Sequence, residues 1–355
     1  MAMTHLEIFR ATVKHEPHQD FLFCASFTPD LERRIRERYH LKPEAGIAEY
    51  FGMYAPAVIQ PKEPEVSKPD FSAYFEGVEK PEGFFINELG VLEIPAKFYH
   101  FTGYISPLRN AKTFLELEKF PFPVARGFDE TGMKEKVTEV HRQGKVSSCW
   151  VGHMYESAWQ IRGYEEFLMD TVERPEWCEY ILDRLTERNL KIATAAARAG
   201  VDVLITGDDV ANQRGLMFSP GVWRQIMKKR WAKVYTAARQ IKPDIQIWYH
   251  SDGNVRDIIP ELVEIGVTIL NPLQPECLNL LEVKKRYGNL LVFEGTIGTQ
   301  STMPFGSPEE VKKVVRERKR DLGYDGALIL APTHVLEPEV PIENIEAFVT
   351  ACREA

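Results

Sequence analysis

Side chains that can bind a metal or move protons gather at the ends of five short apolar segments in the second half of the chain. They are Asp208 and Asp209, His250 and Asp252, Asn271 and Gln274, Glu294, and Thr333 and His334. Imidazole and carboxylate groups are common zinc ligands and common general acids and bases. Because the carboxyl ends of parallel barrel strands meet at one mouth, we expect these residues to form one site there.

These five segments, and one before them in the sequence, have the pattern of strands in a parallel sheet. They are short and rich in β-branched residues, and all but the first follow a longer amphipathic stretch, which is typical of strands covered by helices. The six segments are VSSCWVG (146–152), VDVLITG (201–207), IQIWYH (245–250), VTILNP (267–272), LLVFEG (290–295) and ALILAP (327–332). Ser307 with Glu310 forms a capping box for one intervening helix, and Gly200 and Gly266 stand where two others should end.

The first part of the chain is less regular but supplies the two strands needed for an eight-stranded barrel. These are FLFCAS (21–26) and AVIQ (57–60), with a helix predicted over 31–39. Residues 61–125 begin rich in proline and include a possible hairpin through FFINELGVLEIP and FYHFTGYI. We therefore predict an α/β protein with a single (β/α)8 TIM barrel domain over 1–355, in which 61–125 form an excursion over the mouth.

Composition favours a cytoplasmic enzyme that acts on small molecules. The 355 residues are 44% hydrophobic and carry a formal net charge of −8, so no basic surface for nucleic acid is expected. We find no apolar run of about 20 residues, the length that crosses a bilayer, and expect no membrane association. The five cysteines lack CxxC spacing, so we expect reduced thiols rather than disulfides or a zinc ribbon.

Longer motifs make the chain resemble the uroporphyrinogen decarboxylase superfamily over nearly its whole length. They include SPGVWRQIMKKR (219–230), HSDGNVRDIIPELVEIGVTILNPLQPE (250–276) and APTHVLEPEVPIENIEAF (331–348). That superfamily also contains zinc methyltransferases, which exchange methyl groups between cobalamin proteins and small acceptors. The resemblance implies a (β/α)8 barrel with its site at the strand carboxyl ends, and it is compatible with a homodimer.

The decarboxylase branch fits less well, because its members carry an arginine-rich motif after the first strand that pairs with substrate propionates. Here the corresponding stretch reads FCASFTPDLERR, and Arg33 and Arg34 fall on a predicted helix face. Without an arginine clamp, a substrate with many carboxylates would be poorly neutralised.

The methyltransferase branch holds zinc with H-x-C-G and A-P-G-C-like elements, which here read His250-Ser251-Asp252-Gly253 and Ala331-Pro332-Thr333-His334. Both cysteines are replaced by other residues, so the resemblance implies a metal site of His250, Asp252 and His334, holding one zinc per chain. Nitrogen and oxygen ligands suit polarisation of an oxygen more than activation of a thiol. We therefore predict transfer of a methyl group between a methoxy or methanol-type compound and a corrinoid carried on a partner protein.

Several further roles are predicted, each with an alternative. We expect Asp208, Asp209, Glu294 and Tyr155 to be catalytic, and His153, Asn271, Gln274 and Trp248 to bind substrate. Glu294 is also a candidate fourth ligand, His153 competes with Tyr155 for one role, and Asp252 could be only a helix N-cap. Two other functions stay open: a metal-independent decarboxylase-like lyase acting on a carboxylated ring compound, and a non-catalytic tetrapyrrole or corrinoid carrier.

Overall fold

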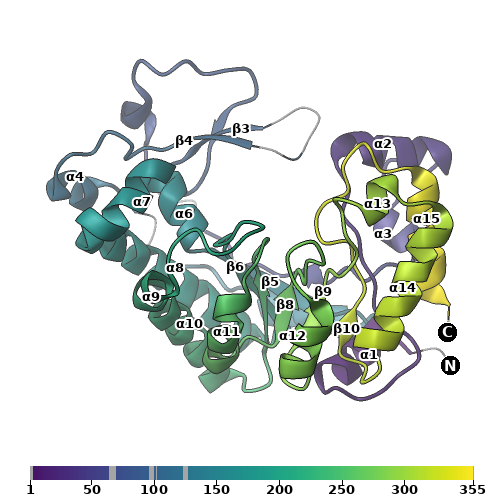
Figure 1. The fold of residues 1–355 in the computed structure, drawn as a ribbon. Coiled ribbons are helices and arrows are strands. Elements are labelled where there is room, and N and C mark those ends of the chain that lie inside the picture. Colours follow the sequence, from purple (N-terminus) through teal and green to yellow (C-terminus); the bar gives the residue numbers. More distant parts are fainter. Residues whose placement is uncertain (1–2, 64–68, 96–99, 101, 123–126, 355) are drawn as a thin grey trace.

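A computed structural model describes residues 3–63, 69–95, 100, 102–122 and 127–354. Its centre is a curled sheet of seven parallel strands, which helices surround (Figure 1). In spatial order the strands are β1 (Ala57–Val58), β5 (Ser147–His153), β6 (Val203–Gly207), β7 (Gln246–His250), β8 (Ile269–Asn271), β9 (Val292–Glu294) and β10 (Leu328–Ile329). The six later segments predicted as strands are confirmed, and AVIQ (57–60) contains β1.

Helices connect these strands in the order expected of an α/β fold. Before β5 lie α1 (His5–Val13), α2 (Pro29–Arg38), α3 (Ile47–Tyr50), the 3-10 turn η1 (Ser72–Phe75), α4 (Phe114–Lys119) and α5 (Met133–Arg142). Between β5 and β8 lie α6 (Tyr155–Arg162), α7 (Tyr164–Glu173), α8 (Pro175–Ala199), α9 (Pro220–Trp223), the π-helical turn η3 (Arg224–Lys228), α10 (Lys229–Ile241), η4 (Arg256–Ile258) and α11 (Ile259–Ile265). The remaining helices are α12 (Leu280–Tyr287), α13 (Thr302–Phe305), α14 (Pro308–Leu322) and α15 (Ile342–Arg353).

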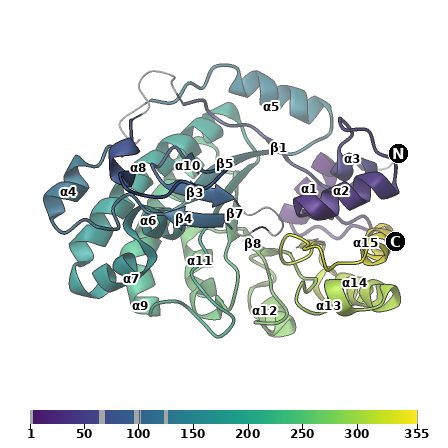
Figure 2. The ribbon, with the colours of Figure 1, turned by 90° about the horizontal axis from the view of Figure 1, so that it is seen from above.

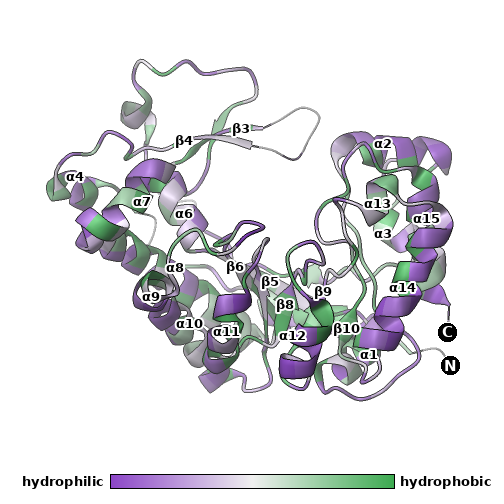
Figure 3. Cartoon of the chain, in the orientation of Figure 1, coloured by the Kyte–Doolittle hydropathy of each residue, from purple (hydrophilic) through white to green (hydrophobic). Residues whose placement is uncertain are grey.

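The residues predicted to begin or end helices stand at helix ends in the structure. Ser307 and Glu310 form a reciprocal capping box at the start of α14. Gly200 and Gly266 follow α8 and α11 in the left-handed conformation, with φ of 88° and 100°, which glycine adopts without a Cβ penalty. Figure 3 shows hydrophilic residues along the outer side of α14 and hydrophobic residues along the central strands. No helix in the described part of the chain is long and apolar enough to span a bilayer.

The prediction of an opening strand over 21–26 was wrong in extent. Phe23 forms only an isolated parallel bridge to Leu330, although its carbonyl also accepts a hydrogen bond from the backbone N–H of Tyr54 at 2.7 Å. A few residues later the carbonyl of Ser26 accepts from the N–H of Leu336, in the loop after β10. The segment therefore lies beside the end of β10 and the loop that follows it, and it pairs with them through isolated bridges without forming a continuous strand.

The predicted hairpin is a three-stranded antiparallel sheet of β2 (Phe85–Ile86), β3 (Leu92–Pro95) and β4 (Thr102–Ile105). Residues 98, 99 and 101 of the predicted FYHFTGYI segment lie outside the described residues. The small sheet lies at the top in Figure 1, and the view from above in Figure 2 places it over the large sheet.

Register across the large sheet brings the strand ends together in rows. Trp150, Ile205 and Trp248 are partners on neighbouring strands, and the row continues through Ile269 to Val292. At the strand ends, His153 pairs with Gly207, Gly207 with His250, and His250 with Asn271. Neighbours in a row point to the same face of a sheet. An apolar row therefore lies directly beneath a row of polar residues.

Gly207 is the residue that lets β6 and β7 approach closely at this point. A Cβ built on Gly207 would lie 2.5 Å from the backbone oxygen of His250 and 2.7 Å from its Cβ. Contacts that short do not occur without movement of the backbone, so any side chain here would displace His250 from its position in the row.

Candidate active site

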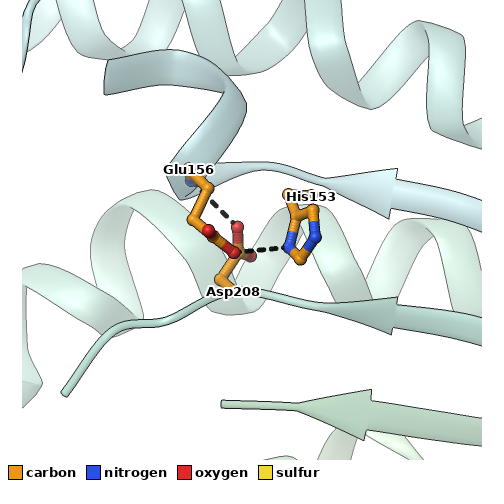
Figure 4. A group of neighbouring side chains, drawn as sticks. All are labelled: His153, Glu156 and Asp208. Carbon is orange, nitrogen blue, oxygen red and sulfur yellow. Dashed lines mark hydrogen bonds and ion pairs between the residues drawn. The ribbon is translucent and has the colours of Figure 1, made fainter. Parts of the chain in front are cut away.

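One cluster at the strand ends joins His153 at the end of β5, Glu156 in the first turn of α6 and Asp208 just after β6 (Figure 4). Nδ1 of His153 lies 2.7 Å from Oε2 of Glu156 and 2.8 Å from the carbonyl of Gly207. Burial lowers the pKa of His153, but Glu156, Asp208 and the carbonyl of Gly207 together raise it by more, and the result is a pKa of about 9. His153 is therefore a cation near neutral pH, held by Glu156.

Glu156 was not among the residues singled out from the sequence. Its Oε2 accepts a hydrogen bond from the backbone N–H of Asp209 at 3.2 Å, so it also positions the loop after β6. A sequence signal existed, since Glu156 follows the strand-end His153 by three residues at the start of a helix.

Asp208, predicted as catalytic, is fully enclosed and hydrogen-bonded at both oxygens. Oδ1 accepts the backbone N–H groups of Met154 at 2.7 Å and Glu156 at 3.2 Å, and Oδ2 accepts the indole N–H of Trp231 at 3.0 Å. Burial raises the pKa of Asp208 to about 7, while His153 lowers it. These hydrogen bonds connect the segment that follows β5 with the segment that follows β6.

Replacing Asp208 with asparagine is expected to lower the free energy of unfolding by about 1–3 kcal/mol, because an amide NH2 would face one of the three donors and leave it unsatisfied. Urea unfolding followed by circular dichroism measures this difference. Asp257→Asn, at an exposed position, is the control and should change stability by less than about 0.5 kcal/mol. Equal stability of the two variants would mean that these three hydrogen bonds do not matter for folding.

A second cluster contains Asp209, His250 and Asp252, each of which offers one ligand atom within 4.8 Å of the other two. Nε2 of His250 lies 3.5 Å from Oδ1 of Asp209, and the backbone N–H of Asp252 donates to that same oxygen at 2.7 Å. Burial lowers the pKa of His250, but Asp209, Asp252 and the hydrogen bond with Asn271 together raise it by more. Burial also raises the pKa of Asp252, which His250 partly offsets. One imidazole and two carboxylates are a fitting donor set for a divalent cation.

A chain of hydrogen bonds orients His250 from behind. Nδ1 of His250 lies 2.7 Å from Oδ1 of Asn271, an acceptor, so the ring donates from Nδ1 and keeps Nε2 free. Nδ2 of Asn271 in turn donates to Oε1 of Glu294 at 3.0 Å. Burial raises the pKa of Glu294 to about 7. The series of hydrogen bonds from His250 through Asn271 thus ends at a carboxyl group that can hold or release a proton near neutral pH.

The remaining predicted residues surround the second cluster, with one exception. Nε2 of His334 lies 3.6 Å from Oδ2 of Asp252, but it is Asp209, not His334, that forms the compact group with His250 and Asp252. Trp248 stacks on His250 with ring centroids 5.7 Å apart, and Oε1 of Gln274 accepts the backbone N–H of Gly253 at 3.0 Å.

Tyr155 is the exception, because its side chain packs against aromatic residues of α7 and of the loop after β6. Its ring is fully buried and packs edge-on against Phe167 and Phe218, with centroid distances of 5.8 and 5.1 Å. Tyr155 thus contributes to the packing between α6 and its neighbours, and its catalytic role stays a prediction.

Two cavities adjoin the second cluster. One has a volume of about 390 Å³ and is lined by Cys24, Trp248, His250, Asn271, Glu294 and His334, among others. The other, of about 410 Å³, is lined by Asp252, Gln274 and His334 together with His100. Both have the size of small-molecule sites. Burial raises the pKa of Cys24 far above its usual range, so this thiol stays protonated.

The two arginines near the start of the chain contact protein groups. Arg33 on α2 pairs with Asp30 at 2.7 Å and with Glu37 at 2.9 Å. Arg34 donates to the carbonyl of Pro338 at 2.7 Å. Both guanidinium groups thus serve the packing of α2, as expected from their place on a helix face.

Comparison with known proteins places these features in context. The family model described as "Uroporphyrinogen decarboxylase (URO-D)" matches residues 139–355, more than half of the chain. The chain is 27% identical over 188 residues to the methylcobamide:CoM methyltransferase MtaA of Methanosarcina barkeri, covering 53% of this chain and 52% of that protein. It is 23% identical over 174 residues to a uroporphyrinogen decarboxylase of Hydrogenobaculum sp. (strain Y04AAS1), covering 49% and 47%. The chain thus spans about half the length of the curated relatives it matches.

A solved structure shares the fold over nearly the whole chain. It is a methyltransferase from Methanosarcina mazei, with a TM-score of 0.67 and 20% sequence identity, and the match covers 99% of this chain and 98% of that one. The curled parallel sheet with its surrounding helices is therefore an architecture already known from another protein.

Proposed function

The chain belongs to the uroporphyrinogen decarboxylase (URO-D) family, as its motifs indicated, and we propose that it is a methyltransferase. The proposed reaction moves a methyl group between a small methoxy or methanol-type compound and a corrinoid carried on a partner protein. Similarity to methylcobamide:CoM methyltransferases supports corrinoid-linked methyl transfer, and the chemistry of the mouth supports an oxygen-bearing compound as the other reactant.

The observation that carries the proposal is the cluster of Asp209, His250 and Asp252, whose ligand atoms lie within 4.8 Å of one another. In our proposal these three side chains hold a zinc ion, with His334 beside Asp252 as a further donor. When bound, such an ion would act as a Lewis acid toward the oxygen of the methyl donor. Oxygen and nitrogen ligands favour this role over activation of a thiol, for which thiolate ligands are better suited.

Other residues of the mouth position the zinc ligands and supply a proton to the methyl donor. The proposed direction is from the oxygen compound to the corrinoid. The methyl group is transferred to the corrinoid, and the electron pair of the broken carbon–oxygen bond stays on oxygen. Glu294, with a pKa of about 7 and a place in the wall of the smaller cavity, supplies the proton that this oxygen needs. Asn271 keeps His250 and Glu294 in a fixed relation through its two hydrogen bonds.

We also propose that residues 1–355 form one closed (β/α)8 barrel domain, in which the segment around Phe23 acts as the eighth strand. In support, the N–H of Cys24 donates to the carbonyl of Leu330 at 3.0 Å, and the N–H of Leu330 donates to the carbonyl of Leu22 at 2.9 Å. On the other side, the N–H of Tyr54 donates to Phe23, and the N–H of Ala57 donates to the carbonyl of Val146 at 2.8 Å. Closure would bring all strand carboxyl ends to one mouth.

Metal analysis combined with a methyl-transfer assay tests the function. The purified chain is expected to bind about one zinc ion. With a reduced corrinoid protein it should form methylcobalamin, followed by visible absorbance, from methanol or dimethyl ether faster than from dimethyl sulfide. A strong chelator should abolish turnover, and added zinc should restore it.

Two results would overturn the proposal. The first is full methyl-transfer activity in protein that contains no metal. Release of carbon dioxide from a carboxylated ring compound, with no methyl transfer, would instead favour the lyase alternative. The second is faster transfer from dimethyl sulfide than from the oxygen compounds, which would contradict the argument from ligand type.

A further inference from the structure

A tryptophan on an otherwise buried strand is left half-exposed. Along β5, Cys149 and Val151 on either side of Trp150 are fully buried, whereas Trp150 is 42% exposed. Its backbone is fixed on both sides by Gln60, which accepts from the N–H of Trp150 at 3.1 Å and donates to its carbonyl at 2.6 Å. The backbone of Trp150 is thus held in place, and an exposed aromatic ring that lines a cavity is a candidate contact for a small molecule.

Trp150 lies in the wall of a third cavity, of about 520 Å³, on the β5 side of the mouth. The cavity lies away from the Asp209, His250 and Asp252 cluster, none of which lines it. Leu89, Leu185 and Ile192 supply apolar wall, and His153 contributes its ring, which meets Trp150 edge-on at 5.0 Å. An apolar wall with a few polar groups is typical of sites for small organic molecules.

The charges around this cavity do not balance. Glu63 and Glu88 both line it, and both pair with the same nitrogen of Arg188, at 2.9 and 3.5 Å. His153 is paired with Glu156 and adds no net charge. When Glu156 is counted with His153, three carboxylates among the described residues thus face two cations around this cavity. Because Glu88 remains 51% exposed while Arg188 is 13% exposed, the unbalanced charge lies on the accessible side.

We propose that this cavity binds a small organic cation, of the alkylated ammonium class, over the face of Trp150. A positive charge is attracted to the face of an indole, which is the strongest aromatic partner for cations. The surplus carboxylate charge of Glu63 and Glu88 favours the same ligand, and the apolar wall accommodates its alkyl groups. A bare metal ion would gain nothing from that wall, and an anion would be repelled by the carboxylates.

Calorimetric titration of the purified chain (residues 1–355) with choline tests the inference. The uncharged molecule 3,3-dimethyl-1-butanol has nearly the same shape and serves as the matched comparison. Choline is expected to bind about tenfold more tightly than this alcohol. Trp150→Leu should weaken choline binding by about tenfold, and Glu88→Gln should weaken it severalfold, with a smaller difference at high salt.

Control variants separate the cavity from general surface effects. Trp159→Leu removes another partly exposed indole, which packs against Tyr104 and Tyr164 outside this cavity, and Glu79→Gln removes an exposed carboxylate elsewhere. Both should bind choline like the parent chain. Glu88→Gln changes an exposed side chain and should therefore fold normally. It still tests the inference if Trp150→Leu does not fold.

The inference is overturned by no choline binding, by equal binding of the alcohol, or by unchanged choline binding in Trp150→Leu and Glu88→Gln. The titration uses no corrinoid protein and no methyl donor. Its failure is therefore distinct from a failure of the proposed methyl transfer.

Discussion

His250→Ala is expected to lower the rate of methyl transfer by about a thousandfold or more and to release most of the bound zinc. His250 is the only imidazole in the cluster with Asp209 and Asp252 within the described residues, and its Nε2 is left free because Nδ1 donates to Asn271. Without it, two carboxylates would remain with only His334, whose Nε2 lies 3.6 Å from Asp252, as a nitrogen donor, which is a poor tetrahedral site for zinc. Zinc content and turnover should therefore fall together.

A graded set of variants measures this effect. Zinc per chain and initial rates are compared for His250→Ala, for Asn271→Ala and for the control His40→Asn. Asn271→Ala removes the group that orients His250 and donates to Glu294 but no proposed zinc ligand, so a smaller loss of about 10–100-fold is expected. His40 is exposed and has a positive φ of 51°, which asparagine tolerates, so its variant should behave like the parent. A His250→Ala protein with full zinc and more than a tenth of the parent rate would rule out the proposed ligand role.

The repeating half of the fold could be predicted from the sequence because its signals are local. A buried parallel strand requires a short run of apolar, often β-branched residues, and all six runs after residue 145 contain a strand. Capping signals such as Ser307 with Glu310 are equally local, since both partners lie within one turn. The segment over 21–26 has the same composition as a strand, yet its pairing depends on residues more than 300 positions away. Those partners are Leu330 and Leu336, which composition cannot reveal.

In the candidate site too, local sequence signals identified some residues, while the positions of others depend on the three-dimensional structure. His250, Asn271 and Glu294 were found because each ends a strand, and register alone places them side by side. The direction of a side chain on a helix depends on the phase of that helix, which explains why Tyr155 at the start of α6 lies in the core. Glu156, one position later, reaches the loop after β6. Whether Asp209 or His334 completes a cluster with His250 is decided by loop geometry, and residue type does not determine it.

Glu294→Gln is expected to lower the rate of methyl transfer by about 10²–10⁴-fold and to change how that rate depends on pH. In the proposed direction Glu294 acts in its protonated form. Because burial raises its pKa to about 7, the parent rate should be highest below pH 7 and fall about tenfold per pH unit above it. Glutamine preserves the shape and the contact with Asn271 but carries no such proton. The variant's residual rate should therefore lack the fall above pH 7.

Stability against pH gives a second measurement that does not depend on turnover. The folded chain holds the Glu294 proton more tightly than the unfolded chain, in which the carboxyl has its ordinary pKa near 4.5. Its contribution to stability is thus complete below pH 4.5 and is lost as the pH rises through about 7, an effect of up to about 3 kcal/mol. Glu294→Gln should not show this loss. The free energy of unfolding of the variant minus that of the parent, measured with urea, should therefore be larger at pH 8 than at pH 4. Glu264→Gln, an exposed carboxylate that pairs with Lys228, is the control and should retain the parent's pH dependence. A Glu294→Gln enzyme with the parent's pH–rate profile would show that another group supplies the proton.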